Sequence, residues 1–425
     1  MALRRASGRD TAAFSADVVA PLLARGVIER RARVENALDR LDADRRAVRR
    51  MQLLRYRYGE EPLLLGVPGR QIAIVLSPAH VKRVLAAAPE PFSPANREKR
   101  AALSHFQPHG VLISTGAERA ERRAFNERVL DTGAAVHREL GAQMAAKVGE
   151  EASALLDAAR RAGSLRWEAF AQAWWRAVRR VTFGDAARED VDVIEELSRL
   201  RRDANWAYFK PVRKRLRGEF LARVRAYLGR AEPGSLASLA AAEPGTFPEE
   251  QFAHWLFAFD AAGMASFRAL ALLDAYSEQA GADPSFLRAC VLESVRLWPT
   301  TPAILRDAAD PVSFDAGSVP AGAAVVVFAP FFHRDGERFP YADSFAPGLW
   351  TGGRSDDDWQ LIPFSRGPAE CPGRDVVLHM TSSFLAKLVE VRPPRQIHAR
   401  RLHAGRPLPA TLSPFRLTFE IPEPG

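Results

Sequence analysis

Hydrophobic residues recur at helical spacing along most of this chain, and they give way to short continuous apolar runs in only a few places. Helix-like patterns cover residues 11–50, 77–88, 117–241, 251–276, 284–298 and 375–389. Apolar runs that predict strands cover residues 63–67, 72–76, 300–329 and 412–421. Segments 91–110 and 234–248 are rich in Pro, Gly and small residues and predict loops. The pattern therefore predicts a mainly α fold with a minor β component.

The most apolar of these helices, residues 251–276, is hydrophobic on nearly every side. Such a helix either spans a membrane or lies inside a large protein, and the polar residues His254, Asp260 and Arg268 favour the second interpretation. Gly263 lies in its interior, where glycine is costly unless a neighbour must approach the backbone closely. Thr246 and Glu249, at its start, have the spacing of a capping box. We therefore expect a central buried helix.

The composition, 47% hydrophobic and 26% charged, is typical of a folded soluble protein and excludes a disordered or collagen-like chain. Two cysteines are too few for a disulfide framework and favour a reducing compartment. Residues 1–30 hold no apolar run long enough for a signal peptide or membrane anchor, so we expect a cytoplasmic protein. The formal charge of +9 favours acidic partners, but no clustered basic tail points to nucleic acid.

Residues 363–373 carry the most specific chemical signal. Cys371 precedes a predicted helix, whose free N–H groups and dipole stabilise a thiolate. Phe364 supplies an apolar wall, while Gly367 and Gly373 bracket the cysteine where a tight turn and a close backbone approach are needed. A buried structural thiol is the plainer alternative. No CxxC spacing supports a zinc site, whereas a single shielded thiolate suits an axial ligand of haem iron.

The pattern Phe364-x-x-Gly367-x-x-x-Cys371-x-Gly373 resembles the haem-ligand signature of the cytochrome P450 superfamily. An ExxR motif at residues 293–296 lies upstream of the cysteine, as it does in that family. The early strand pair, the central helix with its Ala-Gly pair and the segment before the cysteine loop also follow the family's order over most of the chain. The resemblance implies a helical prism with a small β-rich lobe that binds haem b without a covalent bond.

In the family, the ExxR pair is structural. Glu293 and Arg296 lie three apart on one helical face and can share a buried ion-paired network. The family usually completes this network with an Arg from a later segment, and Leu349 stands at that position here. The third member is therefore missing or comes from elsewhere, with His333 and Arg334 as the candidates.

The two propionates of haem require Arg or His donors. Arg119 and Arg123 match the family's pair on the helix that crosses the haem, and Arg306 matches an Arg on the strand beyond the ExxR helix. The usual donor two residues before the cysteine is replaced by Ala369, and Arg366 in the same loop is a candidate substitute.

The family's central-helix motif places a glycine, an acid and a threonine over the iron. Here the corresponding residues are Gly263, Ala265 and Ser266. The resemblance implies that Gly263 opens the helix for dioxygen, but Ala265 cannot relay a proton. Three interpretations remain: Ser266 and water suffice, a polar group of the substrate supplies the route, or the enzyme uses peroxide or catalyses a different reaction. Asp260, at least one turn away, is a weak substitute for the acid.

The resemblance also places a substrate pocket between the 93–112 segment, the central helix and the strand after the ExxR helix. Its expected lining residues are Ala258, Ala262, Thr301, Ile304 and Leu412. Three aromatic residues occupy the region that forms the family's lid, where packing between lid and body is the alternative role: Trp206, Tyr208 and Phe209.

These features together predict a haem-thiolate monooxygenase that oxidises a small organic molecule, with residues 1–425 as one domain. An Arg-rich soluble member of the family suggests a bacterial enzyme of natural-product biosynthesis. No flavin or ferredoxin module is present in the sequence, so separate electron donors, a ferredoxin and a ferredoxin reductase, are expected, with Arg366 and Arg374 near their docking face. The alternatives are a peroxide-using or other non-hydroxylating haem-thiolate enzyme, and a haem-binding sensor without turnover.

Overall fold

The computed structural model describes residues 3–67, 69–243, 247–276, 283–352, 358–390, 393–397 and 402–422. Its helices are α1 (Gly8–Phe14), α2 (Ala20–Arg25), α3 (Ala32–Arg40), α4 (Ala43–Tyr58), α5 (Pro78–Ala86), α6 (Arg97–Leu103), α7 (Gly116–Val129), α8 (Gly141–Ala162), α9 (Trp167–Phe183), α10 (Asp192–Ala204), α11 (Lys214–Arg230), α12 (Leu236–Ala240), α13 (Pro248–Ala275), α14 (Pro284–Leu297), α15 (Ala329–His333), α16 (Gly348–Thr351) and α17 (Arg374–Val389). Its strands are β1 (Leu63–Val67), β2 (Arg70–Ile74), β3 (Phe92–Ser93), β4 (Leu165–Arg166), β5 (Ala303–Ala308), β6 (Val312–Phe314), β7 (Gly317–Val319), β8 (Ala324–Phe328), β9 (Arg395–Gln396) and β10 (Thr418–Glu420). The fold is mainly helical with a small β lobe, as the sequence predicts.

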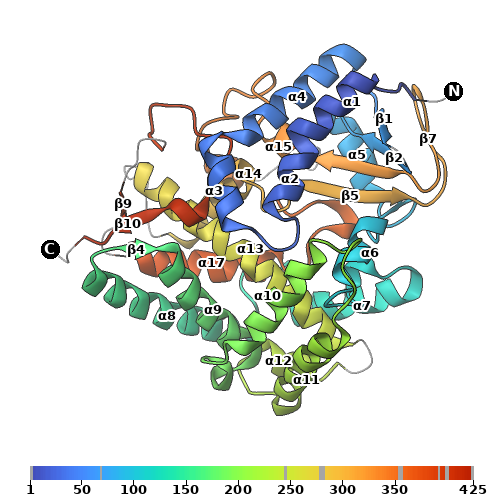
Figure 1. Ribbon diagram of the computed structural model, residues 1–425. Coiled ribbons are helices and arrows are strands. Elements are labelled where there is room, and N and C mark those ends of the chain that lie inside the picture. The colour runs from blue at the N-terminus through green and yellow to red at the C-terminus, as the bar shows by residue number, and fades with distance from the viewer. Residues whose placement is uncertain are drawn as a thin grey trace.

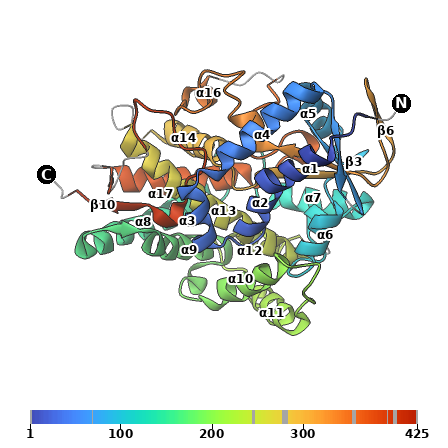
Figure 2. The same ribbon diagram turned by 45° about the horizontal axis from the view of Figure 1, so that its top comes forward.

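The β lobe lies at the N-terminal side of the molecule, whereas α8, α9 and α17 lie towards the C-terminal end (Figures 1 and 2). Its main sheet has the order β1-β2-β8-β5-β3, with β2 and β8 parallel and the other neighbours antiparallel. This sheet shares one hydrophobic core with residues of α1, α4 and α5. A second core holds the helical lobe together.

Helix α13 runs through the centre of the helical lobe and contacts α9, α11, α14 and α17. It begins with Pro248, and Glu249 and Glu250 in its first turn complement the helix dipole. Within the described residues it is the one helix long and apolar enough to cross a membrane, and 78% of its most apolar stretch is buried inside the molecule. The prediction of a buried central helix is thus confirmed. Thr246 of the predicted capping box lies outside the described residues.

Two predicted loops contain short helices. The 91–110 segment includes α6, because Asn96 caps it by accepting the N–H of Lys99 at 3.2 Å. The 234–248 segment includes α12, which Ser235 caps through the N–H of Ser238. The predicted C-terminal strand is also shorter than expected, since it is limited to β10 and preceded by a 3₁₀ turn at Pro414–Arg416.

Candidate functional site

Cys371 lies in a loop that enters α17 and is bent back onto α5. Its N–H donates to the Phe364 carbonyl at 3.0 Å, which closes the loop. Gly367 has φ +76°, and a Cβ there would lie 2.5 Å from the carbonyl oxygen of Leu85, so glycine is required for both conformation and close approach. Gly373 has φ −87°, a value open to other residues. The predicted tight turn is therefore made at Gly367.

The Cys371 side chain is partly accessible. Burial raises the pKa of the thiol, and a hydrogen bond from the backbone N–H of Gly373 and the charge of Arg123 oppose that rise. Cys290 is fully buried within α14, where burial raises its pKa strongly and no opposing donor is present. Of the two cysteines, Cys371 alone combines access with groups that favour a thiolate.

Arg119 on α7 and Arg306 on β5 are buried cations without carboxylate partners. Among the described residues, Arg119 makes no hydrogen bond or ion pair, and Nε of Arg306 is buried without a hydrogen bond. Within the described part of the chain, Arg306 donates only to the Leu305 carbonyl and to Oγ of Ser365, which belongs to the cysteine loop. Burial, together with the charge of Arg119, lowers the pKa of Arg306 to about 10. Two unneutralised cations beside the cysteine loop fit a group with two carboxylates, as haem has.

The other two predicted propionate donors have protein partners. Arg123 pairs with Glu127 and donates to the carbonyl of Glu370, next to the cysteine. Arg366 donates to the carbonyl of Asp358 and lies over the ring of Trp359. Arg123 is thus connected to the loop around Cys371, and Arg366 connects that loop to residues 358–359.

Gly263 faces α9 and is covered by an aromatic ring. A Cβ at this position would lie 2.7 Å from Cδ1 of Trp174, and the Trp174 indole N–H donates to the carbonyl of Phe259 at 2.8 Å. This carbonyl belongs to the residue four before Gly263, so the indole lies against the helical turn that ends at the glycine. The close backbone approach predicted at Gly263 is therefore that of Trp174, and the role of the glycine in admitting dioxygen stays a prediction.

The two polar side chains of α13 considered for a proton relay, those of Ser266 and Asp260, bind other groups of the protein. The Ser266 hydroxyl is fully buried and donates to the carbonyl of Ala262 at 3.0 Å. The Ala265 carbonyl accepts from Oγ of Ser294 at 2.8 Å. Asp260 forms an ion pair with Arg201 at 2.6 Å and therefore does not replace the missing acid.

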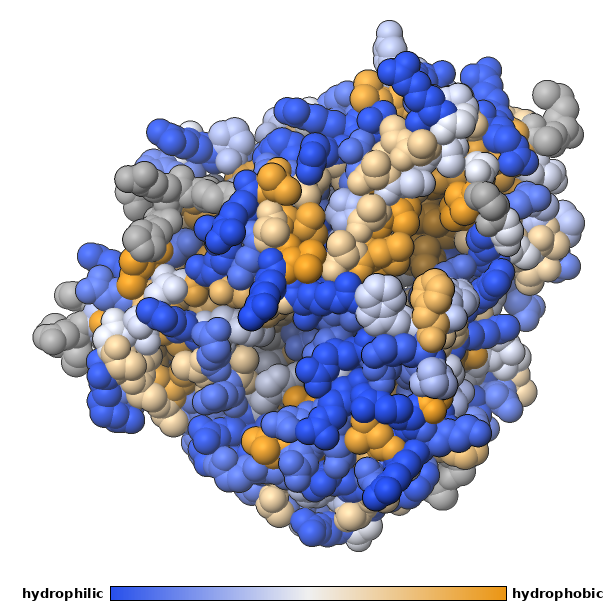
Figure 3. Space-filling model, viewed as in Figure 1, coloured by the Kyte–Doolittle hydropathy of each residue, from blue (hydrophilic) through white to orange (hydrophobic). Residues whose placement is uncertain are grey.

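Helix α13 nevertheless has one partly exposed face. His254, Phe257, Ala258 and Ala261 recur at the spacing of one helical face and are all partly accessible, although most of the helix is buried. The surface seen in Figure 3 is hollowed over β5 and apolar there, above the chain that leads from α10 to α11. Partly accessible residues thus follow one face of α13, whereas its other faces are mostly buried.

The remaining predicted lining residues differ in how far they are buried. Ala262 is buried one turn after Ala258, Thr301 is exposed, and Ile304 packs in the core of the β lobe. Leu412 is buried, and its carbonyl accepts from Arg268 of α13 at 2.8 Å.

The three aromatic residues of the expected lid are exposed. Trp206 and Tyr208 are partly covered by the guanidinium groups of Arg31 and Arg97, respectively, and Phe209 is 84% exposed. In this structure Trp206 and Tyr208 contact basic side chains.

The ExxR network is complete, and a tryptophan supplies its third member. Glu293 and Arg296 are fully buried and pair at 2.6 Å. The Trp350 indole N–H donates to Oε2 of Glu293 at 2.9 Å, and the N–H of Ala346 donates to Oε1 at 2.7 Å. Arg296 is further bonded to the backbone carbonyl of His333 at 2.9 Å.

Neither residue expected to complete the network through its side chain does so. The His333 ring contacts the carbonyl of Arg296 and accepts the N–H of Ile362, while Arg334 pairs with Asp343. The sequence did not reveal the role of Trp350. The resemblance implies an arginine at the position of Leu349, and Trp350 is one position later and carries no charge.

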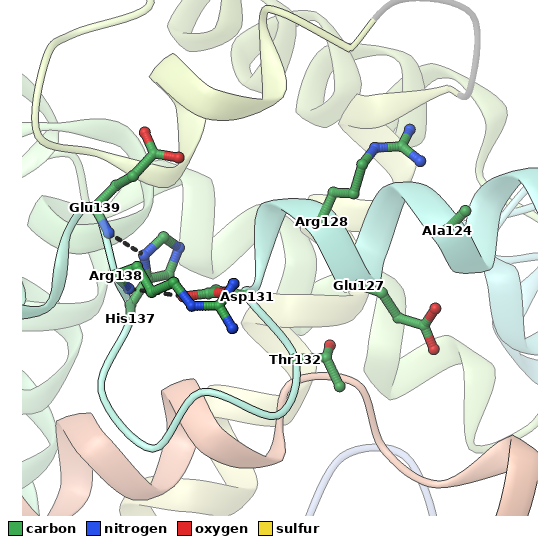
Figure 4. Close-up of a pocket in the computed structure, with 8 residues that line it drawn as sticks. All are labelled: Ala124, Glu127, Arg128, Asp131, Thr132, His137, Arg138 and Glu139. Atoms are coloured by element: carbon green, nitrogen blue, oxygen red, sulfur yellow. Dashed lines mark hydrogen bonds and ion pairs between the residues drawn. The ribbon is translucent and has the colours of Figure 1, made fainter.

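A pocket of about 430 Å³ lies at the C-terminal end of α7 and is shown in Figure 4. Arg138 pairs with Asp131 across it at 3.2 Å, and His137 accepts the N–H of Glu139. The Thr132 hydroxyl connects this region to the loop by donating to the Pro372 carbonyl at 2.8 Å. The pocket is polar and does not include Cys371.

Comparison with known proteins agrees with this geometry. Residues 277–391 match the profile of the family Cytochrome P450. The chain is 33% identical over 111 residues to cytochrome P450 monooxygenase FCK2 of Fusarium pseudograminearum, covering 25% of this chain and 20% of the relative. It is 28% identical over 109 residues to cytochrome P450 4d8 of Drosophila melanogaster, covering 24% of each chain. The match thus spans about a fifth to a quarter of these relatives' lengths.

The fold and the site define a mainly helical protein with one accessible cysteine beside two unpaired buried arginines. Both the matched segment and the motifs within it are those of haem-thiolate proteins. Residues 277–391, about a quarter of the chain, are similar to the cytochrome P450 superfamily. The cofactor of that superfamily is haem, iron protoporphyrin IX, and Cys371, Arg119 and Arg306 are the residues that fit it here.

Proposed function

We propose that the protein is a monooxygenase that inserts oxygen into a small organic molecule, with residues 1–425 as one domain around haem b. The observation that carries this proposal is the position of Cys371, an accessible thiol at the start of α17 beside two buried cations. An enzyme of bacterial natural-product biosynthesis in the cytoplasm remains the finer proposal, based on the Arg-rich composition.

When bound through a thiolate, haem supplies the redox chemistry that activates oxygen. The chain's own residues supply the rest. Cys371 is held at the N-terminus of α17, where the N–H of Gly373 favours its ionised form. Arg119 and Arg306 would neutralise the propionates. The accessible face of α13 would hold the substrate and exclude bulk water.

The direct test is the spectrum of the purified, reduced protein with carbon monoxide. We expect the long-wavelength Soret band of a thiolate-ligated haem in the wild type and its loss in Cys371→Ala. Cys290→Ala is the matched control, since Cys290 lies in α14 without access, and should keep the band. A wild-type spectrum without haem, or an unchanged spectrum in Cys371→Ala, would contradict the proposal.

The proton route favours a second candidate, a peroxide-using or other non-hydroxylating enzyme. The Ala265 side chain has no group that can transfer a proton, and the Ser266 hydroxyl donates to a carbonyl of its own helix. Product formation with hydrogen peroxide alone, exceeding that with NAD(P)H and redox partners, would support this candidate. Product formation that requires the partners would support the monooxygenase.

We also propose a ferredoxin and its reductase as electron donors, docking near the cysteine loop. Arg366 lies on this loop and Arg374 follows it, the latter paired with Glu370 at 3.2 Å. Attraction between a basic face and an acidic ferredoxin is screened by salt. Turnover with an acidic ferredoxin should therefore fall as ionic strength rises, and insensitivity to salt would contradict this docking mode.

A further inference from the structure

Lys99 of α6 and Arg306 of β5 donate hydrogen bonds to the same backbone oxygen. The carbonyl oxygen of Leu305 lies 2.9 Å from Nζ of Lys99 and 3.0 Å from Nη1 of Arg306. The two cationic groups are therefore close neighbours, although they come from different elements. Like charges repel at such a short separation, so this pair is unfavourable unless an anion accompanies it.

Contacts of Arg306 connect this pair of cations to the cysteine loop. Its Nη2 donates to Oγ of Ser365, six residues before Cys371. Lys99 makes one further hydrogen bond, to the carbonyl of Pro94 at 3.1 Å. An ammonium has three donors, so one N–H of Lys99 remains after its two bonds. Lys99 is partly accessible, which leaves this donor available to a ligand.

The acids near Lys99 bind a different arginine. Asp307 pairs with Arg70 at 2.6 Å, and Glu98 pairs with the same guanidinium at 3.0 Å. Within the described part of the chain, neither Lys99 nor Arg306 forms an ion pair with a carboxylate. The pair of cations therefore lacks a countercharge from the protein.

The electrostatics of Lys99 agree with this geometry. Burial lowers the pKa of Lys99 well below its ordinary value, and the charge of Arg306 is the next cause, larger than the opposing effect of either acid. A purely structural bridge between α6 and β5 would not require a charge, because a neutral amide donor could also bind backbone carbonyls. The charge of Lys99 is therefore suited to an anion from outside the chain.

We propose that Lys99 is a third haem-binding cation, which holds a propionate together with Arg306. It would take the part of the donor that the superfamily usually has two residues before the cysteine, where this chain has Ala369. Arg366, the candidate substitute in the sequence, donates to the carbonyl of Asp358 instead. The assignment rests on the proposed haem-dependent function and adds a residue of α6 to the groups that bind the cofactor.

The test compares haem with its dimethyl ester, in which both propionates are neutral. Each cofactor is bound to the haem-free full-length chain, and its transfer to excess apomyoglobin is followed by Soret absorbance. Lys99→Met should speed the transfer of haem about 10-fold or more, which is the effect of losing one charge-assisted hydrogen bond. The same substitution should change the transfer of the ester by less than about twofold, because the ester offers no charge to Lys99.

Two further variants complete the experiment. Arg100→Met makes the same change in net charge at an exposed position of the same helix, and it should leave both transfer rates unchanged. Lys99→Gln keeps a donor for the two backbone carbonyls but removes the charge. It should reproduce the selective effect on haem, and it carries the test if Lys99→Met does not fold.

A contact with the carboxylates appears as a difference between the effects of a Lys99 variant on haem and on the ester, as in a double-mutant cycle. Equal acceleration of both cofactors would show a structural bridge only, and unchanged transfer of haem would show no contact, so either result would overturn the assignment. Failure of the proposed function gives another result, because the wild-type chain would then bind neither cofactor through a thiolate, and both proposals would be rejected.

Discussion

Trp350 donates its indole N–H to the buried carboxylate of Glu293 at 2.9 Å, whereas the resemblance to the cytochrome P450 superfamily implies an arginine as the third member of this network. The Glu293–Arg296 pair therefore keeps a third partner without a second cation. A neutral donor satisfies the oxygen lone pair while adding less electrostatic attraction than a guanidinium does.

This relationship predicts the effect of Trp350→Phe. The variant leaves Oε2 of a fully buried carboxylate with one donor fewer, and we expect it to lower the free energy of unfolding by about 1–3 kcal/mol. Urea unfolding monitored by circular dichroism measures the change. Trp359→Phe is the matched control, because the Trp359 indole N–H is buried without an acceptor, and its removal should cost less. Equal losses in the two variants would contradict a specific role for the Trp350 hydrogen bond.

The contact between Gly263 and Trp174 predicts a destabilising Gly263→Ala variant. Alanine improves helix propensity by about 1 kcal/mol, but its Cβ would lie 2.7 Å from the Trp174 ring, and overpacking costs about 1–3 kcal/mol. We expect a net loss, and a smaller one when Trp174→Leu is already present.

A double-mutant cycle in thermal unfolding measures this coupling. Gly218→Ala in α11 serves as the control, since nothing lies within 4 Å of its Cβ, and it should stabilise the protein. Additive effects of Gly263→Ala and Trp174→Leu would show that the ring does not require the glycine.

Arg306→Met should have opposite effects on the two forms of the protein. In the haem-free form the substitution removes a buried cation whose pKa is lowered to about 10, so at pH 7 the free energy of unfolding should rise by about 1–3 kcal/mol. In the holoprotein it removes a propionate partner, so haem transfer to apomyoglobin should be about 10-fold faster or more. Arg128→Met, an exposed position on α7, should change neither quantity, and the same sign in both forms for Arg306→Met would contradict its assignment to the cofactor.

His254 predicts a pH dependence of stability. Its pKa of about 4 lies below the unfolded value of 6.5, so the unfolded chain takes up a proton first as the pH falls. Stability is therefore lost between about pH 6.5 and 4, and this residue should account for about 2 kcal/mol between pH 7 and pH 5. Urea unfolding of the wild type and His254→Phe at both pH values isolates the difference. A variant with the same pH dependence as the wild type would contradict this role.

The sequence predicts the long elements of this fold well because their signals are repeated many times. The 251–276 helix carries more than six turns of apolar residues, and the structure extends it by only three residues at its start. Helices α6 and α12 have only seven and five residues, and one capping side chain each, Asn96 and Ser235, decides their presence. A single cap is too weak a signal to separate such a helix from a loop.

Residues of the candidate site divide in the same way. Cys371, Gly367 and the ExxR pair stand in motifs and are visible along the chain. The contact between Arg306 and Ser365 joins residues 59 positions apart, and only the fold shows it. The partner of Gly263 illustrates the limit, since a close neighbour is predictable from the glycine but its identity as Trp174, on another helix, is not.

Because β2 pairs in parallel with β8, this part of the sheet cannot form until late in translation. Ile72 pairs with Ala324, which leaves the ribosome 252 residues later. At about 5–20 residues per second, the nascent β1–β2 hairpin waits roughly 10–50 seconds with an unpaired edge before its neighbour exists. During that interval the unpaired edge of the hairpin can pair with other chains. Slower translation or the absence of chaperones should therefore reduce the soluble yield of this protein.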